Sequence, residues 1–271
     1  MKAGILQLTS TDDPSANLTA TRAMMRDAVG QGVGFILTPE VTNCVSVSRR
    51  HQESVLCLEA DDPTLAGLRT EAAALGVWLS IGSLALKTGD ADGRFANRSF
   101  VINPAGDIIA RYDKIHMFDV EVSEKETYRE SAGYRPGAWA VTAQTPFGQL
   151  GLSICYDLRF AYLFRALAQA GADILLVPSA FSPVTGAAHW QPLLQARAIE
   201  TGCYVLAAAQ TGDHGGRETY GHSMAVSPWG EVLLDAGTTK SVSIVDINPH
   251  AVSDARKRIA ALSHDRTFEG P

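Results

Sequence analysis

The chain alternates short apolar runs with longer stretches in which apolar residues recur at helical spacing. The runs FILTP (35–39) and ILLVP (174–178) are apolar on both faces, which is typical of strands in a sheet covered on both sides. Leu158, Ala161, Phe164 and Leu167 fall on one stripe, which predicts a helix after the run LGLSI (150–154). The segment DDPSAN (12–17) places a proline where a first helix would begin. This alternation predicts an α/β protein.

The two halves of the chain resemble each other in order. GILQL (4–8) matches GLSIC (151–155), LGVWLSIGSL (75–84) matches TGCYVLAAAQ (201–210), and FVINPAGDII (100–109) matches MAVSPWGEVL (224–233). Each half is predicted as strand, helix, strand, helix, strand, then two strands joined by a Pro-x-Gly turn. Two sheets packed face to face with helices outside satisfy this pattern. We therefore expect a four-layer α-β-β-α sandwich of two pseudo-symmetric halves, forming one domain over residues 1–271.

Composition excludes several classes of protein. Among 271 residues, 23 Lys and Arg stand against 29 Asp and Glu, a net charge of -6 with no basic block, so neither nucleic acid nor a membrane surface is expected as a partner. No apolar run approaches bilayer length, and the N-terminal apolar stretch is too short for a secretory signal. The four cysteines form no CxxC pair, and no HExxH spacing occurs, so we expect a cytoplasmic location without metal or other cofactor.

Three ionisable residues follow predicted strands: Glu40, Lys114 and Cys155. Taken singly, they fit a surface carboxylate, an edge lysine and a packing cysteine. Ligands in open α/β sheets gather at the carboxyl ends of strands, so we expect the three to meet. A carboxylate can then take the thiol proton, and an ammonium can stabilise the oxyanion formed when the thiolate adds to a carbonyl or nitrile carbon. The backbone N–H of Tyr156 is a candidate second donor, and a helix beginning after Cys155 would favour the thiolate.

These residues lie in segments that resemble a known family. Pro39-Glu40, YDKIHMFDVEV (112–122) and CYDLRF (155–160) look like the three signatures of the nitrilase (carbon–nitrogen hydrolase) superfamily. The resemblance implies an α-β-β-α sandwich, a Glu-Lys-Cys triad acting through a thioester, and dimers or larger assemblies. It also implies a second glutamate beside the thiol, which matches Glu130 in YRES (128–131).

Further segments indicate which branch of the superfamily the chain resembles. PSAFSPVTGAAHW (178–190) and AAAQTGDHGGRETYGHSM (207–224) are similar to the branch of amidases that act on α-keto-acid amides, most closely in the pattern for deaminated glutathione. An ω-amidase acting on α-ketoglutaramate, an N-carbamoyl amino acid amidohydrolase and a nitrilase stay open as alternatives. The chain departs from the branch at Ala161-Tyr162, where Pro-Glu commonly follows the RF pair.

The expected substrate is a small amide that carries a carboxylate, so a basic group should lie near Cys155. Arg159, four residues further on, is the predicted carboxylate ligand, because a guanidinium binds a carboxylate bidentately. Phe181 and Thr185 are expected to line the pocket. The glycine-rich segment around residue 215 is interpreted as a mobile loop.

Other classes of function fit parts of the pattern. An acyltransferase would pass the thioester to an amine or lipid, and a binding protein could keep the fold without activity. A Cys-His site would use His116 or His189 as the base, although no cysteine-protease signature surrounds Cys155. An intact set of Glu40, Lys114, Glu130 and Cys155 favours the amidase.

Overall fold

Two six-stranded sheets form the centre of the protein. The structure is a computed structural model that describes residues 1–123 and 126–270. The first sheet has the order β16 (Ser241–Asp246), β1 (Lys2–Gln7), β2 (Phe35–Leu37), β3 (Trp78–Lys87), β4 (Phe95–Ile102), β5 (Ile108–Asp113). The second has the order β15 (Val232–Asp235), β14 (Met224–Val226), β11 (Tyr204–Ala207), β10 (Ile174–Leu176), β9 (Gly148–Leu152), β8 (Thr142–Thr145). Two ribbons complete the strands: β6 (Asp119–Ser123) with β7 (Glu126–Arg129), and β12 (Thr211–Asp213) with β13 (Glu218–Tyr220).

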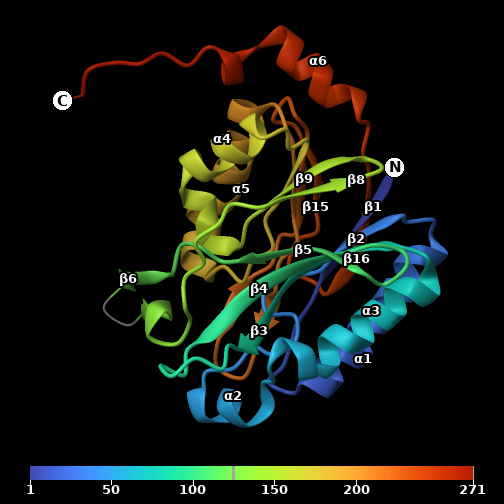
Figure 1. Ribbon diagram of the computed structural model, residues 1–271, viewed down its shortest axis with the longest axis vertical. Coiled ribbons are helices and arrows are strands. Elements are labelled where there is room, and N and C mark those ends of the chain that lie inside the picture. The colour runs from blue at the N-terminus through green and yellow to red at the C-terminus, as the bar shows by residue number, and fades with distance from the viewer. Residues whose placement is uncertain (124–125, 271) are drawn as a thin grey trace.

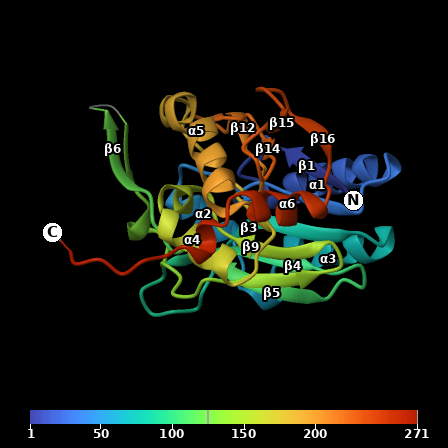
Figure 2. The ribbon, with the colours of Figure 1, turned by 90° about the horizontal axis from the view of Figure 1, so that it is seen from above.

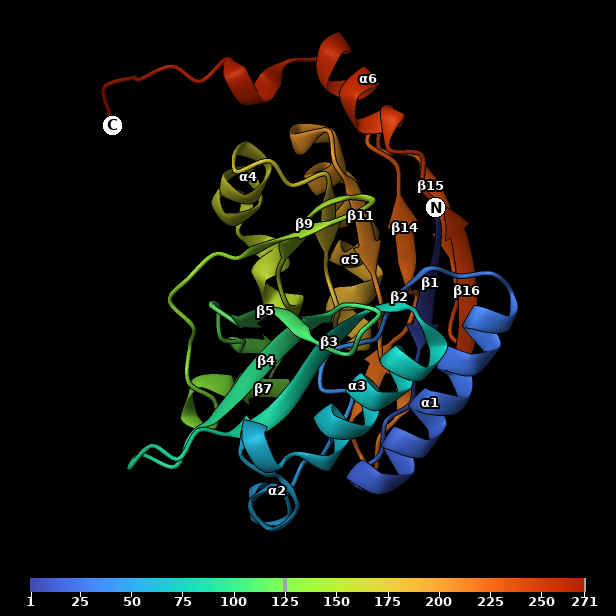
Figure 3. The ribbon, with the colours of Figure 1, turned by 45° about the vertical axis from the view of Figure 1, so that its right-hand side comes forward.

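Helices cover the outer faces of both sheets. α1 (Pro14–Gly30) and α3 (Pro63–Leu75) lie on the first sheet, and α4 (Ala161–Gln169) and α5 (Pro183–Thr201) lie on the opposite side of the molecule (Figures 1 and 3). The remaining helices are α2 (Arg49–Val55) and α6 (His250–Arg258). No helix within the described ranges is both long and apolar enough to cross a bilayer. The expected α-β-β-α sandwich is confirmed.

The two halves share one topology. β1, β2 and β3 run parallel, as do β9, β10 and β11. Two antiparallel strands follow in each half, β4 and β5 in the first and β14 and β15 in the second. An antiparallel edge strand flanks the other side of each sheet, β16 beside β1 and β8 beside β9. The order of elements expected from the internal repeat is therefore correct.

Side-chain alternation in β2 explains why its sequence is apolar throughout. Phe35 and Leu37 pack into the cluster between the sheets, whereas Ile36 packs into the cluster beneath α1 and α3. Because successive side chains of a strand point to opposite faces, both faces of this strand are buried.

The expected helix starts are right in one place and wrong in another. Asp13 caps α1 by accepting hydrogen bonds from the N–H groups of Ser15 and Ala16, with Pro14 in the first turn. After Cys155, however, the chain forms a five-residue 3₁₀ turn (Cys155–Arg159), and α4 begins only at Ala161. The carboxylate of Asp157 causes this tight turn by accepting the Ile154 N–H at 2.8 Å.

This difference corrects two expectations. Phe164 and Leu167 are buried as predicted, but Ala161 is exposed, because the segment before it is not α-helical and the predicted stripe does not continue through that segment. An α-helix dipole does not begin at Cys155, so the expected electrostatic support for the thiolate from that source is absent from this turn. The unusual Ala161-Tyr162 pair lies at the start of α4, where Phe160 offers no side-chain cap.

Two outlying segments lie on one side of the body. The ribbon that contains β6 and the segment after α6 both project there, as seen from above in Figure 2. Backbone from both halves packs closely against Gly82, in the irregular part of β3. A Cβ atom at Gly82 would stand 1.9 Å from the carbonyl oxygen of Thr38 and 2.5 Å from Cβ of Pro178, which belongs to the other half. Only glycine fits this contact.

We predict that Gly82→Ala lowers the free energy of unfolding by about 3 kcal/mol or more, because neither backbone can yield without shifting the strand ends. Urea denaturation followed by circular dichroism measures the change. Gly34→Ala is the matched control, since a Cβ there meets nothing within 4 Å, and its effect should stay within about 0.5 kcal/mol. Equal stability of the two variants would contradict the close approach.

Candidate active site

Four of the residues selected from the sequence meet between the two sheets. Glu40 follows β2, Lys114 follows β5, Cys155 follows β9, and Glu130 opens a 3₁₀ turn after β7. The first three are buried, with 4%, 2% and 7% of their surface exposed, respectively. Glu40 and Cys155 follow parallel strands, whose carboxyl ends lie at one edge of each sheet, whereas Lys114 and Glu130 follow strands that are paired antiparallel. The structure therefore brings the four predicted residues together in one place.

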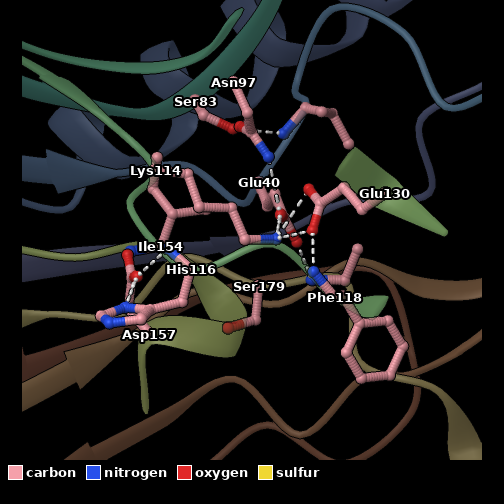
Figure 4. A network of polar contacts seen from close by, with 12 residues as sticks. Glu40, Ser83, Asn97, Lys114, His116, Phe118, Glu130, Ile154, Asp157 and Ser179 are labelled. Carbon is pink, nitrogen blue, oxygen red and sulfur yellow. Dashed lines mark hydrogen bonds and ion pairs between the residues drawn. The ribbon is translucent and has the colours of Figure 1, made fainter. Parts of the chain in front are cut away.

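The ammonium of Lys114 lies between two carboxylates (Figure 4). Its Nζ donates to Oε1 of Glu40 at 2.9 Å and to both oxygens of Glu130 at 2.9 and 2.8 Å. Oε2 of Glu130 also accepts the backbone N–H of Phe118 at 2.6 Å. Three donor contacts thus satisfy the three hydrogens of a buried ammonium.

Glu40 is held from both halves of the fold. Its Oε1 accepts from Nδ2 of Asn97, in β4, at 2.9 Å, and its Oε2 accepts the backbone N–H of Ala180, after β10, at 2.8 Å. Together with burial, the charge of Glu40 raises the pKa of the Cys155 thiol and the same N–H of Ala180 lowers it, and the side chains of Glu40 and Cys155 line one cavity. Sequence analysis missed Asn97 and Ala180, because a polar residue within a strand and a backbone N–H carry no chemical signature.

Burial and charge set the protonation states. Burial raises the pKa of Glu40, but the charge and hydrogen bond of Lys114 outweigh it, so the net pKa lies below the usual glutamate value. Burial lowers the pKa of Lys114, yet the charges of Glu130 and Glu40 raise it well above the usual range. Burial and the charge of Glu40 raise the pKa of the Cys155 thiol despite the nearby ammonium. The resting site therefore holds an ionised Glu40, a charged Lys114 and a protonated thiol.

Two residues at this site adopt left-handed backbone conformations that side chains disfavour. Cys155 has a φ of 50° and Val41, next to Glu40, has a φ of 46°. The N–H of Cys155 donates to the carbonyl of Pro178 at 2.9 Å, and the N–H of Val41 donates to Oγ of Ser83 at 2.7 Å. These contacts hold the two strained residues on either side of the site.

A buried carboxylate links the Cys155 turn to the Lys114 segment. Asp157 accepts the N–H of Ile154 at 2.8 Å, the N–H of His116 at 3.0 Å, and the hydroxyl of Tyr112 at 2.6 Å. Nδ1 of His116 lies 2.6 Å from Oδ1 of the same carboxylate (Figure 4). One side chain thus fixes residues adjacent to the thiol and to the ammonium.

A cavity of about 550 Å³ opens above these groups. Of the predicted binding residues, Tyr156, Phe181 and Thr185 line it. Arg159 does not; it lies in a neighbouring groove, where its Nη1 is 3.2 Å from Nδ1 of His189. The cavity is lined instead by three arginines that sequence analysis did not select: Arg49, Arg129 and Arg217.

The structure also bears on the Cys-His alternative. His116 is engaged by Asp157, and its ring stacks on Phe160 at 3.6 Å. His189 faces Arg159 in the neighbouring groove. In the described ranges neither ring hydrogen-bonds Cys155, and no cluster of three or more His, Cys, Asp or Glu side chains could hold a metal ion.

The fold and the four-residue cluster define a class of enzyme, and comparison with known proteins names it. The family model for carbon–nitrogen hydrolases matches residues 2–257. The deaminated glutathione amidase of Yersinia enterocolitica is 39% identical over 97% of this chain and 92% of its own, and that of Synechocystis is 40% identical over 97% of both. The protein belongs to the carbon–nitrogen hydrolase family and hydrolyses C–N bonds.

Solved structures share the architecture. The NitFhit protein of Caenorhabditis elegans superposes with a TM-score of 0.90 at 35% identity, covering 98% of this chain and 65% of that one. Saccharomyces cerevisiae Nit3, of the nitrilase superfamily, gives a TM-score of 0.87 at 26% identity, covering 99% and 97%. An amidase from Nesterenkonia, with acrylamide added to its active-site cysteine, gives 0.79 at 26% identity, covering 96% and 98%.

We predict that Lys114→Met lowers the free energy of unfolding by about 3–5 kcal/mol near pH 7.5, because it leaves buried carboxylates without their cation. Burial then raises the pKa of Glu40 in the folded variant, so protonation stabilises that variant as the pH falls. The difference in free energy of unfolding between the variant and the wild type should therefore be smaller at pH 5 than at pH 7.5, as measured by urea denaturation. The control is Lys240→Met at an exposed turn, with little effect at either pH. A stability difference that does not change with pH would contradict the conclusion that Lys114 compensates the buried carboxylates.

Proposed function

We propose that the protein is a cysteine amidase in which Cys155 is the nucleophile, Glu40 the general base and Lys114 the oxyanion ligand, with Glu130 supporting Lys114. The main support for this proposal is that these four side chains meet on the floor of one cavity, with the ammonium between the two carboxylates. Cys44 also lines the cavity, but among the described residues its thiol donates only to the backbone carbonyl of Asp12, at 3.7 Å.

The first step forms a thioester. Because the thiol is protonated at rest, Glu40 takes its proton as the sulfur adds to the amide carbon. The tetrahedral intermediate then collapses: the C–N bond breaks, and the leaving nitrogen receives the proton from Glu40. The acyl group stays on Cys155, and a neutral amine or ammonia departs.

The negative oxygen of the intermediate needs donors fixed in advance. The ammonium of Lys114 is one, and Glu130 keeps it charged and aimed by holding it from the side opposite Glu40. The N–H of Tyr156 is the second, because it follows the strained Cys155 and donates to no backbone carbonyl among the described residues. Both donors are in place before the substrate arrives, which supports their assignment.

Hydrolysis of the thioester repeats the same proton path. Glu40 takes a proton from water as the water oxygen attacks the acyl carbon, and the C–S bond breaks. The thiolate of Cys155 regains the proton from Glu40, and the carboxylic acid product leaves. Overall, one amide and one water give one carboxylic acid and one amine, with the site restored.

Deaminated glutathione, the α-keto acid derived from glutathione, is the substrate that we propose. Two of the similar proteins bear that activity in their names, at 39% and 40% identity. The cavity of about 550 Å³ is large for a simple amide, and arginines line it, which suits a substrate with carboxylates at its ends. Assembly into dimers or larger oligomers stays a prediction.

Replacing Cys155 with alanine should abolish release of the amine from deaminated glutathione, and Glu40→Gln should reduce kcat at least about 10²-fold, because an amide cannot accept the thiol proton. Brief incubation of the wild type with substrate should leave an acyl adduct on Cys155 alone, seen by mass spectrometry of peptides. Cys203→Ala, which removes a buried thiol outside the cavity, is the matched control for both measurements.

Two results would refute this assignment. One is an acyl adduct on Cys44, the other thiol of the cavity; the second is near-normal turnover by Glu40→Gln. Parallel assays with α-ketoglutaramate, a simple nitrile and an N-carbamoyl amino acid decide the substrate class. Faster turnover of any of these would overturn deaminated glutathione as the substrate without affecting the chemistry.

A further inference from the structure

Arg217 is the one arginine of the cavity wall whose guanidinium lacks a strong partner in the described part of the chain. Its only hydrogen bond there is a long one, 3.4 Å from an Nη atom to the carbonyl oxygen of Ala180. The ring of Tyr128 lies 5.9 Å from its Cζ. The side chain is half-buried, so part of its hydration has been removed without a carboxylate in exchange.

The two other arginines of the wall are already occupied. Arg49 donates to the carbonyls of Gly133 at 2.8 Å and Gly93 at 2.5 Å, and its guanidinium lies 3.5 Å from the centre of the Phe95 ring. Arg129 pairs with Glu121 at 2.5 Å. Binding a ligand through either residue would first break these contacts, whereas Arg217 has donors to spare.

The position of Arg217 is fixed by the ribbon of β12 and β13. His214 lies buried between the carbonyl oxygen of Ser10, at 2.7 Å, and the hydroxyl of Thr219, at 2.8 Å. The N–H of His214 also donates to the carbonyl of Arg217 at 2.9 Å, which closes the turn. The glycine-rich segment, which the sequence analysis interpreted as a mobile loop, therefore has hydrogen bonds on both sides of Arg217, at His214 and at Thr219.

Arg217 lies close to the floor of the cavity. Its hydrogen-bond acceptor, Ala180, is the residue whose N–H binds Oε2 of Glu40 at 2.8 Å. The charge of Arg217 contributes to the lowered pKa of Glu40, although less than Lys114 does. A substrate whose amide carbon is at Cys155 would thus share one cavity with this guanidinium.

We infer that Arg217 is the carboxylate-binding residue of the cavity and that it selects amides carrying a carboxylate. This inference rests on the proposed amidase function. Arg217 replaces Arg159 as the predicted carboxylate ligand, because Arg159 lies in the neighbouring groove beside His189. A free, anchored guanidinium offers paired N–H donors to a carboxylate, and such charge-assisted bonds are among the strongest available to a protein.

A labelling experiment tests the inference without relying on turnover. Cys155 is alkylated with 3-maleimidopropionate or with its neutral amide, and mass spectrometry gives the rate on Cys155 for each reagent. We expect the ratio of the two rates, anionic over neutral, to fall about 10- to 100-fold in Arg217→Gln and less in Arg217→Lys. Arg50→Gln, which removes an equal charge from an exposed position outside the cavity wall, should leave the ratio unchanged.

Kinetics then identify which carboxylate is bound. A rise in KM for both deaminated glutathione and α-ketoglutaramate assigns Arg217 to the keto-acid half that they share, and a rise for deaminated glutathione alone assigns it to the peptide half. An unchanged labelling ratio in Arg217→Gln, or an equal fall in Arg50→Gln, would overturn the inference. Since labelling needs no hydrolysis, absence of amidase turnover would refute the proposed function separately.

Discussion

The buried ammonium of Lys114 is the interaction on which the site depends. An isolated charge in the interior is costly, and two carboxylates on opposite sides compensate for it here. Each carboxylate is itself fixed by backbone: Glu40 by the N–H of Ala180, Glu130 by the N–H of Phe118. The arrangement needs strand ends from both sheets, so the sandwich and the cluster stabilise each other.

Local strain at the site is balanced by contacts from the same strand ends. Cys155 occupies a left-handed conformation three residues after the end of β9, and its side chain lines the cavity together with Glu40. Asp157 holds this turn from behind and also binds the segment that carries Lys114. The proposed nucleophile and the proposed oxyanion ligand are therefore held in place by Asp157, which has 0% of its surface exposed and takes no part in the proposed proton path.

The sequence allowed the layers, the repeat and the grouping of Glu40, Lys114 and Cys155 to be predicted, because strand periodicity and the positions of strand ends indicate them. Glu130 could be assigned only from the resemblance to the nitrilase superfamily. The sequence did not allow the 3₁₀ turn after Cys155 to be predicted, since that turn depends on where the Asp157 carboxylate points. The prediction of Arg159 as the carboxylate ligand failed for a similar reason.

Proximity in sequence favoured Arg159, whereas the cavity is lined by Arg217, 58 residues further along on a separate ribbon. Which arginine reaches a cavity depends on tertiary packing, and spacing along the chain carries no such information. The same holds for Asn97 and the N–H of Ala180, whose roles come from what lies opposite them.

The central claim is that Cys155 rests as a thiol and is activated only when Glu40 takes its proton. The most direct measurement is the rate of Cys155 alkylation by iodoacetamide as a function of pH, followed by mass spectrometry of the intact protein. The account predicts slow alkylation through neutral pH, with the rate rising only above pH 9.0, the ordinary pKa of a cysteine thiol, because burial and the charge of Glu40 raise the pKa of this one. A rate that reaches its plateau below pH 7 would show a resting thiolate paired with Lys114 and would contradict the account.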